Sequence, residues 1–137
     1  MCLRRRFYKA DVRWISAGEK REILYHKGKI YIRQLTLFYD ADNNTGTHNN
    51  KWIIKIDSDE ILNMKLIDIH ECLAGCMVCK ESDRPVVSII HDSTYKIYCV
   101  ILRDVGIVNE GIEIWIDNVD TSNGCSVRVG MIYDVLE

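Results

Sequence analysis

The chain has 137 residues, of which 47% are apolar, and these values predict a single domain, residues 1–137, with one hydrophobic core. Its 18 basic and 20 acidic residues leave a net charge of −2, which excludes the strongly basic footprint of most nucleic-acid-binding proteins. No window approaches the roughly 18 uncharged apolar residues of a membrane span. The first residues lack the apolar segment of a secretory signal. We therefore expect a cytoplasmic protein that binds neither nucleic acid nor membrane.

The N-terminal part of the sequence carries short strand patterns. Residues 4–9 (RRRFYK) are basic with two aromatic residues, and we expect a flexible, solvated terminus over residues 1–10. Alternation of apolar and polar residues predicts a first strand at 11–15. Residues 22–26 fit either a strand or a last helical turn.

The stretch from Lys27 to Glu60 has the clearest pattern in this half of the chain. Residues 30–39 and 52–56 are rich in β-branched and aromatic residues, and a turn rich in Asn, Asp, Gly and Thr separates them. In the second run apolar side chains alternate with Lys51 and Lys55, which is typical of a half-buried strand. The pattern predicts a β-hairpin.

Residues 57–73 permit two structures. Asp57 with Glu60 three residues later is a capping-box arrangement, which indicates the start of a helix. Residues 63–69 fit a strand equally well, with Met64 and Leu66 pointing inward. Because both neighbouring segments read as strands, we favour a turn followed by a strand.

The C-terminal half is rich in strand patterns. Residues 86–91 and 94–102 predict a second hairpin, and residues 112–116 and 127–131 alternate as two further strands. The final tail fits a strand or one helical turn. The whole chain is therefore expected to be mainly β: an antiparallel roll, barrel or sandwich of about seven or eight strands, with at most one short helix.

The order of strand, polar turn, strand and further apolar run resembles the front of pleckstrin-homology-like and GRAM-like domains. It is similar, in the same way, to the archaeal taxis adaptor family CheF. The resemblance implies a non-catalytic adaptor domain that binds protein partners, or lipid head groups in some relatives. The basic loop that lipid-binding members use has no counterpart here. The residues that carry the resemblance are 28–32, 35–39, 52–56 and 60–61.

One cysteine-rich segment could carry chemistry. Cys72, Cys76 and Cys79 have the C-x3-C-x2-C spacing, which resembles the loop that holds a [4Fe-4S] cluster in radical S-adenosylmethionine enzymes. With His70 they could instead supply the four ligands of a structural zinc ion. A disulfide or redox pair is a third reading. We favour a fourth, in which the cysteines are buried packing residues, so that no cofactor is expected.

No catalytic set is apparent in the sequence, so we expect no enzymatic activity. The leading hypothesis is an adaptor module that presents a surface or a sheet edge to a protein partner, anchored by exposed aromatic residues at Tyr31, Tyr98 and Trp115. The alternatives are a metal or iron-sulfur protein built on the cysteine segment, and a self-associating structural subunit or small inhibitor that forms homo-oligomers through an edge strand.

Overall fold

The computed structural model describes residues 4–41, 49–69, 86–92 and 97–136. These residues form nine strands and a single helical turn. The prediction of a mainly β fold is confirmed. The elements are β1 (Arg4–Ile15), β2 (Lys20–Lys27), β3 (Ile30–Asp40), β4 (Lys51–Ile56), β5 (Asp59–Lys65), α1 (Leu66–Asp68), β6 (Val86–Asp92), β7 (Ile97–Val108), β8 (Gly111–Asp117) and β9 (Cys125–Val135).

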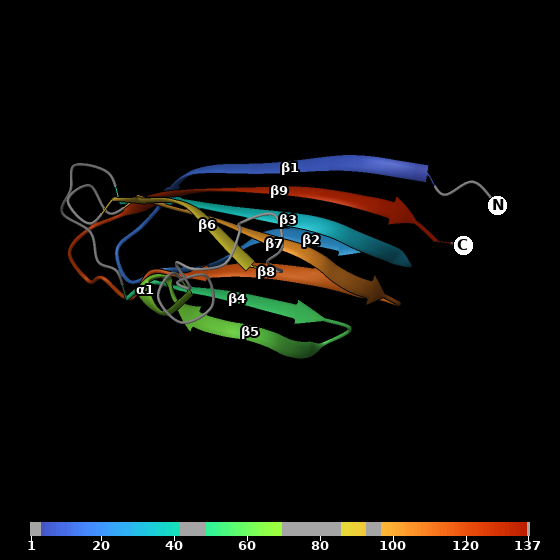
Figure 1. Cartoon of the computed structure of the whole chain (residues 1–137). Coiled ribbons are helices and arrows are strands. Elements are labelled where there is room, and N and C mark those ends of the chain that lie inside the picture. Colours follow the sequence, from blue (N-terminus) through green and yellow to red (C-terminus); the bar gives the residue numbers. More distant parts are fainter. Residues whose placement is uncertain (1–3, 42–48, 70–85, 93–96, 137) are drawn as a thin grey trace.

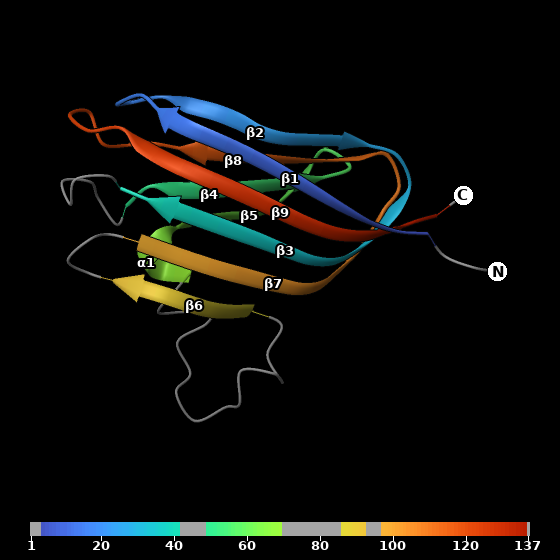
Figure 2. The same cartoon turned by 90° about the horizontal axis from the view of Figure 1, so that it is seen from above.

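The strands form two antiparallel sheets that face each other as a sandwich (Figure 1). Sheet A has the strand order β1-β9-β3-β7-β6, and sheet B has the order β2-β8-β4-β5. The chain passes back and forth between the sheets, so most strands that are neighbours in sequence lie in different sheets. Without β6, the two sets of four have the strand order of an eight-stranded jelly roll. Figure 2 shows sheet A with β6 beyond β7.

The core lies between the sheets because the strands alternate apolar and polar side chains. On β3 the fully buried residues include Leu35, Leu37 and Tyr39, and on β8 they include Ile112 and Ile114. Burying a side chain of this size stabilises a fold by about 1.5 to 3 kcal/mol. These inward rows are therefore what hold the two sheets together.

The hairpin predicted for residues 27–60 is wrong. Its two strands are present as β3 and β4, but β3 pairs with β7 and β9, whereas β4 pairs with β5 and β8. Each strand has a strongly apolar face. The face of β3 enters the core from sheet A, and the face of β4 enters it from sheet B. The second predicted hairpin is confirmed, since β6 pairs antiparallel with β7.

The capping box predicted at Asp57 is also wrong. Asp57 and Ser58 form the tight turn between β4 and β5 with positive φ angles of 51° and 70°, the backbone conformation that two-residue hairpins favour. The favoured turn followed by a strand is confirmed only in part, because β5 ends at Lys65 and residues 66–68 of the predicted strand 63–69 form the helical turn α1. Residues 4–10, expected to be flexible, lie in β1, and residues 22–26 lie in β2.

Candidate functional site

The outward side of sheet A differs from an ordinary solvated sheet surface. Because side chains alternate along a strand, Tyr31, Thr36 and Phe38 point away from the core that Leu35 and Leu37 enter. The registers of β1, β7 and β9 extend this surface across the sheet. We call it the outer face of sheet A. Its apolar members are Phe7, Tyr31, Phe38, Ile97, Cys99, Ile101, Ile107 and Ile132.

Two of these side chains are strongly exposed for their type. Phe7 on β1 is 75% exposed and Ile107 on β7 is 56% exposed. Phe7 lies opposite Ile132, and Ile107 lies opposite Tyr31 in the ladder. The apolar residues therefore spread over neighbouring strands and do not stand singly, which is what distinguishes an interaction surface from scattered exposed residues.

Arginine side chains accompany the aromatic rings of this face. The Arg33 guanidinium lies 5.1 Å from the centre of the Tyr31 ring, and that of Arg128 lies 5.8 Å from the Phe38 ring. Both distances are within the range of a cation–π interaction. Among the described side chains that face outward from sheet A, the basic residues are arginines, and neither Lys nor Glu occurs.

Asp134 anchors two of the arginines. Its carboxylate is 2% exposed and accepts hydrogen bonds from Nε of Arg33 at 2.5 Å and from Nε of Arg5 at 3.3 Å. Burial alone would raise the pKa of Asp134, but the hydrogen bonds and charges of Arg33 and Arg5 outweigh it and leave the pKa below its ordinary value. The carboxylate therefore stays ionised and holds both guanidinium groups against the face.

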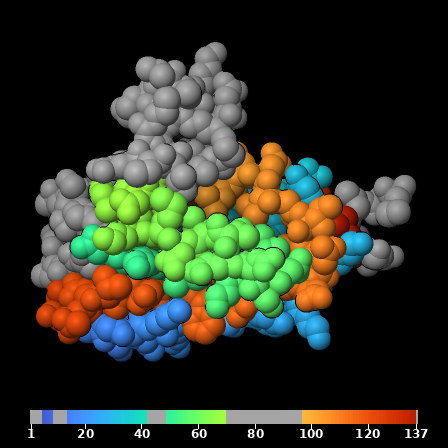
Figure 3. All heavy atoms as spheres, turned by 90° about the horizontal axis from the view of Figure 1, so that it is seen from below, coloured from blue at the N-terminus to red at the C-terminus, as the bar shows by residue number. Residues whose placement is uncertain are grey.

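The outward side of sheet B has a different composition. One cross-strand row contains Tyr25, Glu113, Lys55 and Glu60, and its charged members alternate in sign. Another row contains Lys20, Asp117, Lys51 and Lys65. Figure 3 shows this side of the molecule, with β4 and β5 in green. Interspersed lysine and carboxylate side chains are what a solvated sheet surface carries.

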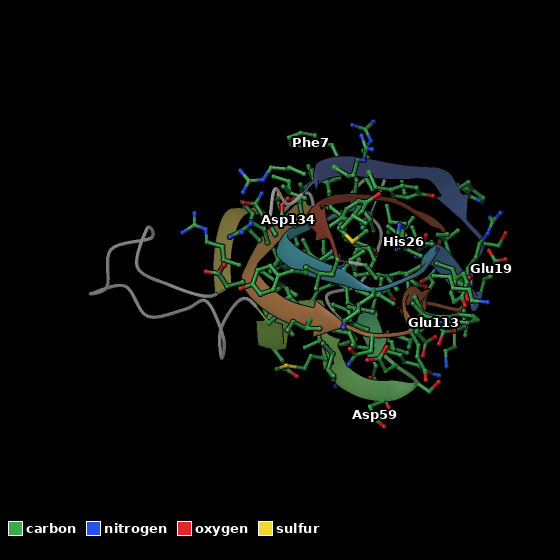
Figure 4. All side chains as sticks on the ribbon, turned by 90° about the vertical axis from the view of Figure 1, so that its right-hand side faces the viewer. Phe7, Glu19, His26, Asp59, Glu113 and Asp134 are labelled. Atoms are coloured by element: carbon green, nitrogen blue, oxygen red, sulfur yellow. The ribbon has the colours of Figure 1, made fainter. Side chains whose placement is uncertain are left out.

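A polar pocket lies at the end of the sandwich where β2 and β4 finish and β8 begins. It has a volume of about 660 Å³. Figure 4 looks on to this end and labels Glu113 and His26. The side chains around the pocket include Tyr25, Lys27, Asp57, Ser58, Glu110 and Glu113.

Asp57 ties together the turns that form the pocket. Its Oδ1 accepts hydrogen bonds from the backbone N–H groups of Glu110 at 2.6 Å and Gly111 at 3.1 Å, and its Oδ2 accepts one from Asn109 at 3.0 Å. The N–H of Glu110, with those of Asn109 and Gly111, holds the pKa of Asp57 below its ordinary value. Through these hydrogen bonds the carboxylate connects the β4–β5 turn to the β7–β8 turn.

Replacing Asp57 with asparagine is expected to lower the melting temperature at pH 7, because a neutral amide is a weaker acceptor for three N–H groups. Since the folded-state pKa is depressed, the carboxylate stabilises the fold above its unfolded pKa of about 3.9, and this stabilisation is lost as the pH falls through the lower folded value. The difference in the free energy of unfolding between wild type and variant should therefore shrink as the pH falls. Urea unfolding at several pH values measures it. The control is the exposed neighbour Asp59, changed to asparagine. A difference in stability that does not depend on pH would contradict the stabilising role of the Asp57 carboxylate.

The structure places the three predicted aromatic anchors in different environments. Tyr31 lies on the outer face of sheet A, and Trp115 lies half-buried on the outward side of sheet B, with the Lys20 ammonium 5.8 Å from its ring centre. The exposure expected for Tyr98 is wrong, because its side chain is fully buried opposite Tyr39. The sequence did not indicate three further residues of the outer face, Phe7, Phe38 and Ile107. Phe7 belongs to the basic and aromatic segment 4–9.

The cysteine segment with Cys72, Cys76, Cys79 and His70 lies outside the described residues. The zinc and iron-sulfur alternatives therefore stay predictions. Within the described part of the chain no three His, Cys, Asp or Glu side chains gather as metal ligands. Cys99 and Cys125 form no disulfide within the described part of the chain. None of the described helical residues forms a helix long and apolar enough to cross a membrane.

No family model matches the sequence, and no curated protein matches it.

Proposed function

We propose that this protein is a non-catalytic module that binds a protein partner through the outer face of sheet A. The observation that carries the proposal is the composition of this face, in which aromatic and isoleucine side chains are mixed with arginine. Protein interfaces are enriched in aromatic residues and arginine and depleted in lysine and glutamate. The outward side of sheet B carries lysine and glutamate side chains beside Tyr25, Ile53 and Trp115, so it differs from this face in its lysine and glutamate content.

The arginines indicate the chemistry of the partner. Among the described side chains on the outward side of sheet A, Arg5, Arg33, Arg103 and Arg128 contribute four positive charges, and Asp40 and Asp134 contribute two carboxylates. A complementary partner surface is therefore apolar at its centre with aspartate or glutamate around it. Guanidinium groups already held by Asp134 or seated over a ring lose little freedom on binding, which favours affinity.

The jelly-roll strand order does not itself select this function. Two-sheet β-sandwiches of this kind host many unrelated activities, so the composition of the surface, and not the fold, indicates the function. The adaptor role implied by the resemblance to pleckstrin-homology-like domains agrees with the proposal.

The experiment compares three immobilised proteins: wild type, the double variant Phe7→Ser with Ile107→Ser, and the control Ile61→Ser. Ile61 on β5 is 51% exposed and lies outside the outer face of sheet A, so it matches the exposure of the test residues. A partner captured from extract, then purified, should bind wild type and control alike and bind the double variant at least about tenfold more weakly. Equal binding by all three proteins would overturn the proposal.

Hydrogen exchange on the reconstituted complex locates the contact independently. Backbone amides of β3, β7 and β9 should gain protection, whereas those of β5 should not. Protection confined to sheet B would contradict binding through the outer face of sheet A.

A further inference from the structure

Two arginine side chains on the outer face of sheet A share one carboxylate. Arg33 donates from Nε to Oδ2 of Asp134 at 2.5 Å, and Arg5 donates from Nε to Oδ1 at 3.3 Å. The register explains why they meet, because Asp134 on β9 lies between Arg5 on β1 and Tyr31 on β3. Figure 4 labels Asp134 on this outward side of the sheet. The two guanidinium groups therefore lie next to each other.

A β-bulge gives Arg33 its position. The ladder between β3 and β9 shifts between Ile32 and Gln34, so Arg33 has no residue opposite it on β9. A bulge releases a residue from regular pairing and changes the direction of its side chain. The guanidinium of Arg33 lies 5.1 Å from the centre of the Tyr31 ring while its Nε bonds to Asp134. The bulge, the ring and the carboxylate together fix where this guanidinium points.

The Nη groups of both arginines are available to a ligand. A guanidinium has five N–H donors, four of which are on its Nη atoms. Among the described residues, the hydrogen bonds of Arg5 and Arg33 are those that their Nε atoms donate to Asp134. No second carboxylate in the described part of the chain lies within 4 Å of either guanidinium. Most of the donor capacity of the pair is therefore unused.

The shared carboxylate does not cancel the charge that a ligand meets. Asp134 is 2% exposed, whereas Arg5 is 56% exposed and Arg33 is 40% exposed. A group that approaches from solvent therefore reaches the guanidinium groups first, and two of them against one carboxylate leave a positive charge. Because Asp134 already holds both side chains, little of their conformational freedom remains to be lost on binding.

This arrangement suits a phosphate group better than a carboxylate. A single guanidinium fork satisfies both oxygens of a carboxylate. A phosphate monoester has three terminal oxygens and a charge of about −1.5 to −2 at pH 7, so it can use two neighbouring forks. Ile107 lies opposite Tyr31 in the ladder and is 56% exposed. It offers an apolar surface close to the arginines for the group that carries the phosphate.

We propose that Arg5 and Arg33 bind a phosphorylated side chain of the protein partner, with the apolar part of the partner packed on Ile107. The inference rests on the proposed function and names the group that the outer face of sheet A recognises. Asp134 is a positioning residue in this site, because it contacts the arginines and lies beneath them.

Phenyl phosphate tests the site without the partner. The side-chain Nε–H signals of Arg5 and Arg33 in the isotope-labelled full chain report binding directly by NMR. We expect both signals to shift, and benzoate, which carries a carboxylate on the same ring, to bind at least about tenfold more weakly. Equal binding of the two compounds, or shifts that leave these two arginines unaffected, would overturn the phosphate site.

Conservative variants separate the guanidinium fork from its charge. Arg5→Lys and Arg33→Lys keep the positive charge, and each should weaken phenyl phosphate binding at least about tenfold because the planar fork is lost. Arg21→Lys is the matched control, since Arg21 is exposed on β2 in sheet B. Circular dichroism checks that each variant folds. Binding that is unchanged in the folded test variants, or weakened equally in the control, contradicts the proposal.

The purified partner connects the site to the proposed function. Phosphatase treatment of the partner should weaken its binding to wild type at least about tenfold, and Arg33→Lys should then cause little further loss. A partner that binds equally well after treatment would overturn the inference and leave binding through the outer face intact. If wild type instead binds phosphatidylcholine vesicles that contain phosphatidic acid, while phosphatase has no effect on the partner, the arginines bind a lipid head group and the inference is wrong. The proposed function fails separately, when the double variant at Phe7 and Ile107 binds the partner as wild type does.

Discussion

Replacing Asn50 with alanine is expected to destabilise the protein by about 2 to 4 kcal/mol, because it leaves polar groups inside the core without hydrogen-bond partners. Asn50 is fully buried between β3 and the turn that follows β8. Its Nδ2 donates to the hydroxyl of Tyr39 at 2.8 Å, and its Oδ1 accepts the backbone N–H of Val119 at 2.9 Å. Alanine supplies neither group and also leaves a small cavity.

The environment of Tyr39 shows why this site is sensitive. Burial raises the pKa of Tyr39 far above its ordinary value, and the neighbouring Cys125 acts in the same direction. The phenol therefore stays neutral and needs a hydrogen-bond partner inside the protein. Asn50 also ties the start of β4 to α1, because its backbone carbonyl accepts the N–H of Leu66 at 2.8 Å.

Urea unfolding of wild type, Asn50→Ala and Tyr39→Phe measures the effect. Tyr39→Phe keeps the ring and removes only the hydroxyl, so its cost should be about 1 kcal/mol. A loss below about 1 kcal/mol for Asn50→Ala would mean that water replaces the amide at this position.

Replacing Trp52 with alanine is expected to cost about 3 to 5 kcal/mol, the usual range for removing a large buried aromatic residue. Trp52 on β4 points into the core and is fully buried. Trp115 on the adjacent strand β8 faces the other way and lies opposite Ile53 in the ladder. Alanine at Trp115 should therefore cost much less, about 1 to 2 kcal/mol, through lost contact with Ile53.

The phenylalanine variant separates ring packing from hydrogen bonding at Trp52. Among the described residues Nε1 of Trp52 is buried and has no hydrogen-bond acceptor. Trp52→Phe therefore removes no hydrogen bond and should be milder than Trp52→Ala. Thermal and urea unfolding of the three variants provide the comparison. Equal losses at Trp52 and Trp115 would contradict the assignment of one residue to the core and the other to the surface.

Prediction from sequence succeeded where a strand has one apolar face. On β8 Ile112, Ile114 and Ile116 are all fully buried, and the alternation identified both the strand and its inward side. On β7 the alternation did not identify the inward side, because apolar residues occupy both sides of the strand. Cys99 and Ile101 alternate there with Tyr98 and Val100. Either face could have been the buried one. The exposure of Tyr98 was mispredicted for this reason.

Strand pairing was a different problem. Residues 30–39 and 52–56 read as strands correctly, but a pattern of alternation does not specify which strand becomes the neighbour. The jelly-roll strand order makes most pairings long-range, such as β1 with β9, which lie at opposite ends of the chain. Such pairings are selected by burial of both sheet faces against each other, which is a property of the whole chain.

The sequence by itself determined the strand content, the inward faces of the regular strands and the absence of a large basic footprint, because these depend on composition and on alternation along a few residues. The tertiary structure alone decided the surfaces. It brought Arg5 and Arg33 to Asp134, 129 and 101 residues away, and it joined the turns at Gly28, Asp57 and Glu110 into one acidic pocket. Local pattern carries no information about such contacts, since the two-sheet packing that creates them is set by the summed burial of residues from every strand.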